Sequence, residues 1–314
     1  MPEKISTRVA YGQALAECGA EENIVVFDAD LSICTMTCTF RDKYPERFFE
    51  AGIAEANMVG MSAGMAATGK TVFCNSFAMF SAGRAYDQVR NSIAYPHLNV
   101  KVVGTHAGLS VGEDGATHQC IEDLALMRAI PGMTVICPSD ANETRAAVKT
   151  MVAYDGPCYL RLGRLPVDAA TEGKNYKFEL GKGFVLRGGR DVTLIATGLM
   201  VQEAVKASKL LEAKGIDARV IDMHTIKPID REIILKAASE TGAIVTAEEH
   251  NILGGLGGAV SEVVAEGNPV PVLRVGVEDK FGHSGPALQL MEKYGLTAEH
   301  IVTQAEKAVK LKKK

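Results

Sequence analysis

Short apolar segments alternate with longer helix-like segments along nearly the whole chain, and this order restricts the possible fold more than any other feature. In the first half, strand-like runs occupy residues 24–27, 71–77, 100–104, 134–137 and 159–162, and helix-like segments occupy residues 7–18, 79–95, 119–127 and 140–154. Asp140 and Glu143 form a capping box at the start of the last helix. Apolar strands alternating with helices predict a parallel sheet covered on both faces.

The second half repeats this architecture. Strands are predicted at 192–196, 218–221, 243–247 and 270–275, and helices at 201–214, 230–239, 256–265, 286–294 and 298–311. The segment between the halves is polar and has no periodicity, which is typical of a linker. We therefore predict an α/β protein of two domains, each a mainly parallel sheet flanked by helices, with residues 1–165 as the first domain, 166–184 as the linker and 185–314 as the second.

Charge and cysteine usage exclude several classes of protein. The net charge is −4, which gives no electrostatic basis for nucleic-acid binding. We expect neither a signal peptide, because the first residues lack an apolar core, nor a membrane span, because no apolar run approaches about 18 residues. The seven cysteines include no CxxC pair with zinc-ligand spacing, so we expect reduced thiols in a cytoplasmic protein.

One glutamate interrupts a run of small and apolar residues. Glu55 lies in the segment 51–64, where glycine, alanine and methionine fall on every helical face, so we expect a buried helix. No neighbour in this segment can neutralise the carboxylate, and an isolated buried carboxylate is unfavourable unless it is protonated or hydrogen-bonded. A carboxyl group that shares a proton with a ligand serves acid–base catalysis. The alternative is a structural role, in which Glu55 caps a helix or pairs with a distant arginine.

The densest cluster of polar groups follows the strand at 100–104. Residues 104–119 contain four glycines, two histidines (His106 and His118) and two acids (Glu113 and Asp114). Glycines let a backbone approach a ligand closely, and the polar side chains supply donors and acceptors for a polyhydroxylated substrate. A metal site and a purely structural loop are the alternatives, although histidines twelve residues apart lack the i, i+4 spacing of a helical zinc site.

Three further features follow strands or open helices. Phe77 and Phe80 lie at a strand-to-helix turn, where they suit a flat heterocycle or simply pack in the core. Arg164 emerges from the end of a strand, where it can hold a phosphate or form a surface salt bridge. The glycine-rich run 254–258 opens a helix and suits either an anion or close helix–sheet packing. Ligands of open parallel sheets bind beyond the carboxyl ends of the strands, which points to the segments after residues 27, 77, 104 and 162.

Together these motifs resemble transketolase. The similarity covers Gly-Ile-Ala-Glu-Ala-Asn-Met at 52–58, the run 73–80, Arg-Ala-Tyr-Asp-Gln at 84–88, Gly-Glu-Asp-Gly-Ala-Thr-His-Gln at 112–119, Pro-Ser-Asp at 138–140 and Ile-Lys-Pro-Ile-Asp at 226–230. It matches only the carboxyl-terminal half of a usual transketolase, because the Gly-Asp-Gly motif and later asparagine that hold magnesium in the family do not occur here. The resemblance therefore implies the C-terminal subunit of a split enzyme, with a partner chain that supplies the diphosphate-binding domain.

The resemblance also implies an activity and cofactors. The expected reaction is thiamine-diphosphate-dependent transfer of a two-carbon ketol unit from a ketose phosphate to an aldose phosphate, in the pentose phosphate pathway. Magnesium is expected to bind through the partner subunit, so no metal ligand is assigned to this chain. Because the family site forms at a dimer interface, we expect a heterotetramer with two copies of each chain.

On the cofactor side, the resemblance implies that Glu55 hydrogen-bonds a ring nitrogen of the aminopyrimidine. This bond favours the imino tautomer, which deprotonates the thiazolium carbon. Phe77 and Phe80 match the aromatic pocket around the pyrimidine. Asp30 matches an acid near the cofactor at the subunit contact. The family's phosphate-binding serine falls within residues 31–35, where the local sequence gives no clear match.

On the sugar side, His106 and His118 match the histidines that contact the hydroxyls and the carbonyl oxygen of the ketose donor. Asp114 matches the acid that reads the configuration of the C2 hydroxyl. Arg164 matches an arginine that binds the substrate phosphate.

Two related families are the alternatives. The β subunit of 2-oxoacid dehydrogenases shares the length, the fold and the glutamate motif, but it lacks the His106 and Gly-Glu-Asp-Gly-x-Thr-His pattern. Deoxyxylulose phosphate synthase has a similar Asp-Gly-x-Thr-His-Gln run but is normally one chain, and it carries alanine where Glu113 stands here. A non-catalytic assembly subunit that kept the fold is a third possibility, against which Glu55, His106, Asp114 and His118 argue.

Overall fold

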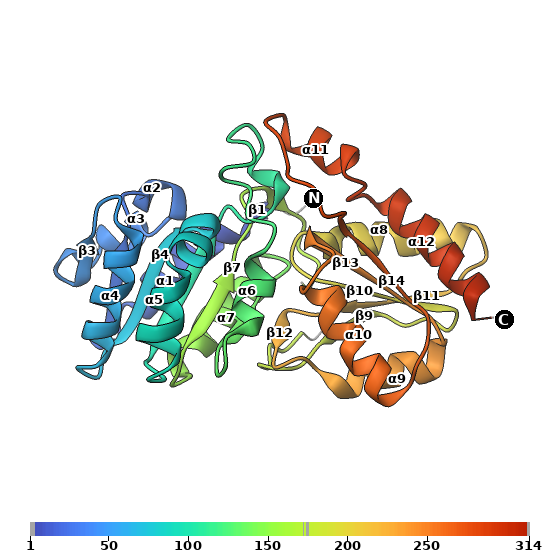
Figure 1. Cartoon of the computed structure of the whole chain (residues 1–314), viewed down its shortest axis with the longest axis horizontal. Helices are drawn as coiled ribbons and strands as arrows, with labels where there is room; N and C mark the ends of the chain where they lie inside the picture. Colours follow the sequence, from blue (N-terminus) through green and yellow to red (C-terminus); the bar gives the residue numbers. More distant parts are fainter. Residues whose placement is uncertain (1–3, 172, 174–175, 313–314) are drawn as a thin grey trace.

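The computed structural model describes residues 4–171, 173 and 176–312. In its seven-stranded sheet every strand except β12 comes from the blue-to-green half of the chain (Figure 1). The strand order is β12-β6-β7-β5-β4-β2-β3. The strands are β2 (Ile24–Asp28), β3 (Phe48–Glu50), β4 (Thr71–Phe77), β5 (Val100–Thr105), β6 (Thr134–Ile136), β7 (Cys158–Arg161) and β12 (Thr225–Lys227). All neighbours pair in parallel except β12, which runs antiparallel to β6.

Helices cover both faces of this sheet because alternate side chains of each strand point to opposite sides. On one face, Ile24 and Val26 pack with α1 (Thr7–Cys18), α3 (Cys38–Arg41) and α7 (Ala141–Ala153). On the other face, Val25 and Phe27 pack with α4 (Glu55–Ala66) and α6 (Asp123–Ala129). A short helix, α2 (Ser32–Thr35), follows β2.

Two helices differ from their predicted form. The predicted helix 79–95 consists of π-helical segments at Met79–Arg84 and Val89–Ala94 around the short α5 (Tyr86–Gln88). The helix predicted from residue 119 begins only at Asp123, because residues 106–122 form an irregular loop that includes one 3₁₀ turn at Leu109–Val111.

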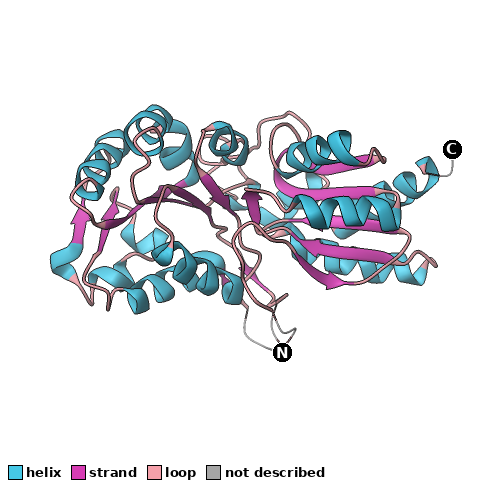
Figure 2. Ribbon diagram, turned by 90° about the horizontal axis from the view of Figure 1, so that it is seen from below, coloured by secondary structure: helices cyan, strands magenta, loops and turns pink. Residues whose placement is uncertain are grey.

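The second sheet has the order β14-β13-β10-β11-β9 and lies in the yellow-to-red half. Its strands are β9 (Phe184–Arg187), β10 (Val192–Ala196), β11 (Ala218–Asp222), β13 (Ile244–Asn251) and β14 (Val272–Val277), parallel except for the edge strand β9. Helices flank it on both sides (Figure 2): α8 (Met200–Ala213), α9 (Arg231–Thr241), α10 (Leu256–Gly267) and α12 (Ala298–Leu311). The predicted fold class is confirmed.

The two halves are tied together more closely than a simple linker would allow. Strand β12 comes from the second half of the sequence but completes the first sheet. In the linker region, β8 (Pro166–Val167) pairs antiparallel with β1 (Ile5–Ser6) at the start of the chain. A continuous apolar cluster also joins Leu124 and Met127 of α6 to Leu256 and Val260 of α10. The halves therefore share part of one core.

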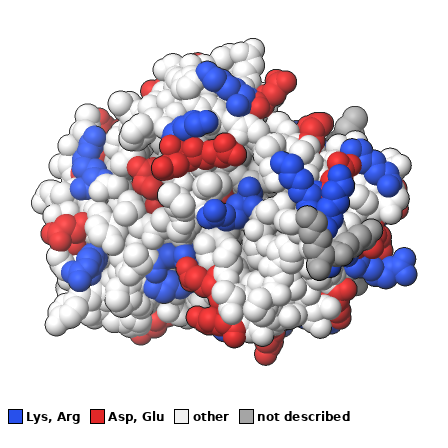
Figure 3. Space-filling model, turned by 45° about the vertical axis from the view of Figure 1, so that its right-hand side comes forward, with Lys and Arg blue, Asp and Glu red and all other residues white. Residues whose placement is uncertain are grey.

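Surface features agree with the composition. Lysine and arginine are interspersed with aspartate and glutamate over the face drawn in Figure 3. All seven cysteines are free, and burial raises the pKa of Cys74 to about 12, so this thiol is inert at neutral pH. Among the described residues, no helix is both long and apolar enough to cross a membrane.

Candidate active site

Glu55 is the first residue of α4, and the structure corrects the prediction that nothing neutralises it. Its side chain is only 3% exposed, and Nη1 of Arg84 donates to both carboxylate oxygens at 3.0 and 2.9 Å. The pairing with a distant arginine, our structural alternative, is therefore what the chain adopts. The surrounding helix is also not buried on every face, because Gly60, Met61 and Gly64 are exposed. A carboxylate with one half-exposed cationic partner can exchange that partner for another nitrogen donor.

Aromatic and imidazole rings gather beside this ion pair, at the carboxyl ends of β4 and β5. The Arg84 guanidinium lies 4.3 Å from the Phe80 ring centroid, so it joins Glu55 to the aromatic group. Phe77 and Phe80 are nearly parallel, with an interplanar angle of 17° and centroids 6.1 Å apart. His106 lies 4.0 Å from Phe77, and His118 meets Phe80 edge-on at 5.2 Å. Phe77 and Phe80 from one predicted motif and His106 and His118 from another thus form one cluster.

His106 is held in a costly conformation. Its φ of 55° lies in the left-handed region, which is uncommon for non-glycine residues. Burial lowers its pKa to about 3, with further lowering from the positive charges of Arg8 and Arg164. The imidazole is therefore neutral at physiological pH, and its Nδ1 lies 3.0 Å from Oγ1 of Thr105.

The rest of the loop 104–119 is organised around the same centre. His118 Nδ1 lies 2.9 Å from the Thr117 hydroxyl, and Asp114 is exposed at the loop surface. The described residues include no group of three or more histidine, cysteine, aspartate and glutamate side chains placed to hold a metal ion. Gln119, which we predicted as the start of a helix, instead donates to the carbonyls of Leu109 and Gly112 across the loop.

A cationic cavity of about 590 Å³ opens beside the loop, and Arg164 lines it together with Arg8. Arg164 donates to the Val111 carbonyl and, at 3.3 Å, to the Glu113 carboxylate, so the predicted salt-bridge alternative is present. Because Arg164 is 39% exposed, this pair is weak and leaves the guanidinium available to an anion. Arg8 donates to the Cys34 carbonyl at 2.7 Å. Two guanidinium groups on one cavity favour a doubly charged anion.

Two predicted features lie apart from this centre. Asp30 is exposed after β2, where its backbone N–H donates to Glu50 at 2.5 Å, and no contact of the described residues joins it to the ring cluster. The N-terminus of α10, within the run 254–258, already holds an anion, because the Glu248 carboxylate accepts from the N–H groups of Leu256 and Gly257 at 2.7 Å each. The glycines there serve an internal carboxylate.

Sequence reasoning missed Arg84, Arg8 and Gln119 as parts of this site. Arg84 lay within a quoted motif, and its position four residues after Phe80 was a usable signal, since i, i+4 side chains on one helical turn are neighbours. Arg8 had no local signal, because long-range contacts, such as the pairing of β1 with β8 and the Gly163 N–H donating to the Thr7 hydroxyl, bring it near Arg164.

Comparisons with known proteins identify the family. Residues 3–168 match the family described as "Transketolase, pyrimidine binding domain", and residues 181–301 match "Transketolase, C-terminal domain". A putative transketolase C-terminal section from Methanocaldococcus jannaschii is 50% identical over 96% of this chain and 96% of its own length. Human transketolase is 39% identical over 95% of this chain, which spans 48% of the human sequence.

A solved structure extends the likeness to three dimensions. A split-gene transketolase, determined as an inactive β4 tetramer, is 51% identical and superposes with a TM-score of 0.90 over 99% of this chain and 100% of the other. The chain therefore belongs to the transketolase family, in which it corresponds to the C-terminal section of a split, thiamine-diphosphate-dependent enzyme that transfers ketol groups.

Proposed function

We propose that this chain supplies the pyrimidine-binding and sugar-recognising side of a transketolase site that a separate N-terminal subunit completes. The observation that carries the proposal is the single cluster in which Glu55, through Arg84, adjoins Phe80, Phe77 and the two loop histidines. A buried carboxylate, parallel aromatic rings and two imidazole groups suit a flat nitrogen heterocycle and a polyol side by side.

The cofactor-side residues fit an aminopyrimidine. Phe77 and Phe80 offer near-parallel ring faces, and the Glu55 carboxylate is an acceptor for a ring nitrogen in the place that Arg84 now fills. When bound, thiamine diphosphate supplies the carbanion-stabilising chemistry of ketol transfer. Glu55 would hold a proton at the pyrimidine nitrogen. Asp30 is proposed to lie near the cofactor at a subunit contact, which its exposed position permits.

The sugar-side residues fit a phosphorylated ketose. His106 and His118 would contact the hydroxyls and the carbonyl oxygen, and the neutral imidazole of His106 can both donate and accept there. Asp114 would read the configuration of the C2 hydroxyl. We add Arg8 to Arg164 as a phosphate ligand, because both guanidinium groups line the same cavity.

The assembly follows from the same proposal. The partner would carry the diphosphate-binding domain and Mg²⁺, in a complex with two copies of each chain; the inactivity of the related β4 tetramer supports a need for the other subunit. We propose residues 1–165 as the pyrimidine-binding domain, 166–184 as the linker and 185–314 as the C-terminal domain, supported by the family matches at 3–168 and 181–301. The free cysteines support a reducing, cytoplasmic location, where the pentose phosphate pathway would use this activity.

The deciding experiment is ketol transfer from xylulose 5-phosphate to ribose 5-phosphate, with thiamine diphosphate and magnesium. The chain is assayed alone and then mixed with the N-terminal subunit from the same source. Activity only in the mixture supports the proposal. Full activity of the chain alone refutes the need for a partner. Turnover of a 2-oxoacid in the mixture, without sugar turnover, would refute the substrate assignment.

A further inference from the structure

One buried side chain of the second half reaches into the loop that carries His106, Asp114 and His118. Glu249 lies on β13, and its Oε1 accepts a 2.5 Å hydrogen bond from the backbone N–H of Ser110. Ser110 sits at the centre of the 3₁₀ turn Leu109–Val111, between the two histidines in sequence. The Glu249 side chain is 3% exposed, so this bond is protected from water.

The loop backbone is shaped around this carboxylate. Gly108 has a φ of +83°, a conformation that side-chain-bearing residues rarely adopt. A Cβ atom at Gly108 would also collide with the Glu249 carboxyl group. Glycine is therefore required at position 108 for two reasons, its backbone conformation and the close approach of the Glu249 carboxyl group.

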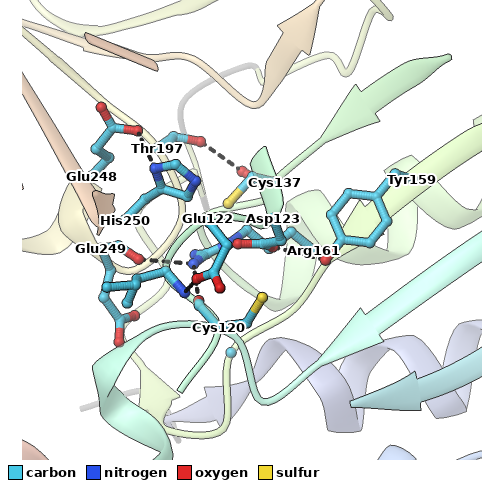
Figure 4. A network of polar contacts seen from close by, with 12 residues as sticks. Cys120, Glu122, Asp123, Cys137, Tyr159, Arg161, Thr197, Glu248, Glu249 and His250 are labelled. Atoms are coloured by element: carbon cyan, nitrogen blue, oxygen red, sulfur yellow. Dashed lines mark hydrogen bonds and ion pairs between the residues drawn. The ribbon is translucent and has the colours of Figure 1, made fainter. Parts of the chain in front are cut away.

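A buried network fixes Glu249 in turn (Figure 4). Arg161, at the end of β7, donates through Nη2 to the Glu249 carbonyl at 2.8 Å and through Nε to Asp123 at 2.9 Å. Tyr159 also donates to Asp123, at 2.7 Å. Further along β13, the Asn251 N–H donates to the Ile121 carbonyl at 2.7 Å. Strand β13 is thus attached to the loop by a backbone bond and to the sheet behind it by a charge-assisted bond from Arg161.

The far side of the loop is held from the second half as well. Gln119 donates from Nε2 to the carbonyl of His283 at 3.0 Å, in addition to its bonds across the loop. The loop is therefore clamped between β13 and the segment before α11 (Ala287–Lys293). None of the residues we assign to cofactor or sugar comes from this second half, yet its side chains define the loop's path.

We propose that Glu249, from the C-terminal domain, is a positioning residue for sugar binding. It sets the path of the loop 104–119 by accepting a hydrogen bond from the Ser110 N–H. This inference rests on the proposed sugar contacts of His106, Asp114 and His118. It gives the second half of the chain a part in substrate recognition, because loss of the bond frees the backbone between the two histidines. Misplacement of substrate-positioning groups by about 1 Å can cost roughly 100-fold in rate, so the effect is measurable.

The test compares Glu249→Ala with Glu249→Gln in the complete two-subunit enzyme. Glutamine keeps the acceptor oxygen at the same place, whereas alanine removes it. We expect Glu249→Ala to raise the KM of the ketose donor by at least about tenfold while the affinity for thiamine diphosphate stays within about twofold, and Glu249→Gln to restore most of the loss. Equal KM values for the alanine variant and the wild type would overturn the proposal.

The matched control is Glu248→Ala, one residue earlier on the same strand. Glu248 is equally buried, but it caps α10 instead of the loop. Its loss should lower the melting temperature without changing the donor KM. If Glu248→Ala raises the KM as much as Glu249→Ala does, general destabilisation explains both, and the proposal is wrong.

Hydrogen exchange provides a readout that does not depend on activity. In the purified chain, the Ser110 amide should exchange at least about tenfold faster in Glu249→Ala than in the wild type, while amides of β13 stay protected. Unchanged protection of Ser110 would overturn the positioning role. If exchange responds as expected but the wild-type complex transfers no ketol unit, Glu249 still holds the loop backbone, whereas the proposed function fails and with it the link between this contact and sugar binding.

Discussion

Replacement of Glu55 by glutamine separates the catalytic role of this residue from its structural one. The substitution keeps the volume of the side chain and removes one charge from the pair with Arg84. The Arg84 side chain is 51% exposed, so after the substitution its guanidinium is solvated and leaves no buried cation behind. Half-exposed pairs of this kind contribute about 1 kcal/mol or less to stability. Glu55→Gln should therefore unfold at nearly the wild-type denaturant concentration.

Removal of the other partner of this ion pair should cost more stability. Arg84→Ala leaves the Glu55 carboxylate, 3% exposed, without its cation. A buried charge stripped of its partner costs about 3–5 kcal/mol, but water reaches this site through the space Arg84 vacates, so we expect about 1–3 kcal/mol. The two halves of one ion pair thus have unequal costs, because only one of them is buried.

Catalytic activity should rank the two variants in the opposite order, with the greater loss in Glu55→Gln. Loss of a general acid–base group typically lowers a rate by about 10²–10⁴-fold, so Glu55→Gln should lose that much ketol-transfer kcat in the two-subunit enzyme. Arg84→Ala should retain far more turnover, since the carboxylate remains for the pyrimidine. Urea unfolding and steady-state assays on both variants test the argument. Wild-type turnover in Glu55→Gln, or a greater stability loss there than in Arg84→Ala, would refute it.

Three further predictions concern phosphate recognition and pH. Arg164→Ala should raise the KM of phosphorylated sugars by about tenfold or more and that of unphosphorylated sugars little; equal effects would reject its phosphate role. His106 has a folded-state pKa of about 3, below its ordinary 6.5, so its contribution to stability is lost as pH falls from about 6.5 to about 3. His106→Gln should therefore reduce the dependence of the urea midpoint on pH in this interval. Midpoints of the variant and the wild type that change in parallel with pH would contradict the prediction. Burial raises the pKa of Glu143 to about 7 and also raises that of Asp222, so ionisation of these acids opposes folding as pH rises. Asp222→Asn should therefore raise the melting temperature more at about pH 8 than at about pH 5. An increase that does not depend on pH would contradict the prediction.

Periodicity predicted most of the scaffold because the sheets are buried on both faces. Strands such as β4 and β10 coincide with their predicted bounds, since a continuous apolar run between breakers has few other structures open to it. The capping of α7 also followed from local sequence: Asp140 accepts from the Glu143 N–H, although the Glu143 side chain reaches back to the N–H of Ser139 and not to that of Asp140. Such features depend on near neighbours in sequence.

The edge strands and the clamp on the loop could not be predicted in this way. Strand β12 has only three residues, and it forms a strand because β6 offers an open edge. Its Thr225 pairs with Ile136, which lies 89 residues earlier in the sequence. Glu249 has no local signature either, since its partner Ser110 is 139 residues away. An acid inside an apolar strand indicates a buried interaction but does not identify its partner.

Glu55 and Glu249 show why a buried acid has to be interpreted with its partner. Both residues are 3% exposed, and the local sequence alone does not reveal the partner of either. Glu55 is held by a half-exposed guanidinium at the end of a π-helical segment, which a ligand can displace. Glu249 is held by a backbone N–H and lies directly beneath Gly108, and no ligand can replace these without refolding the loop. Exchangeable partners favour chemistry and fixed partners favour positioning, so substitutions at Glu55 should affect kcat, whereas those at Glu249 should affect the donor KM.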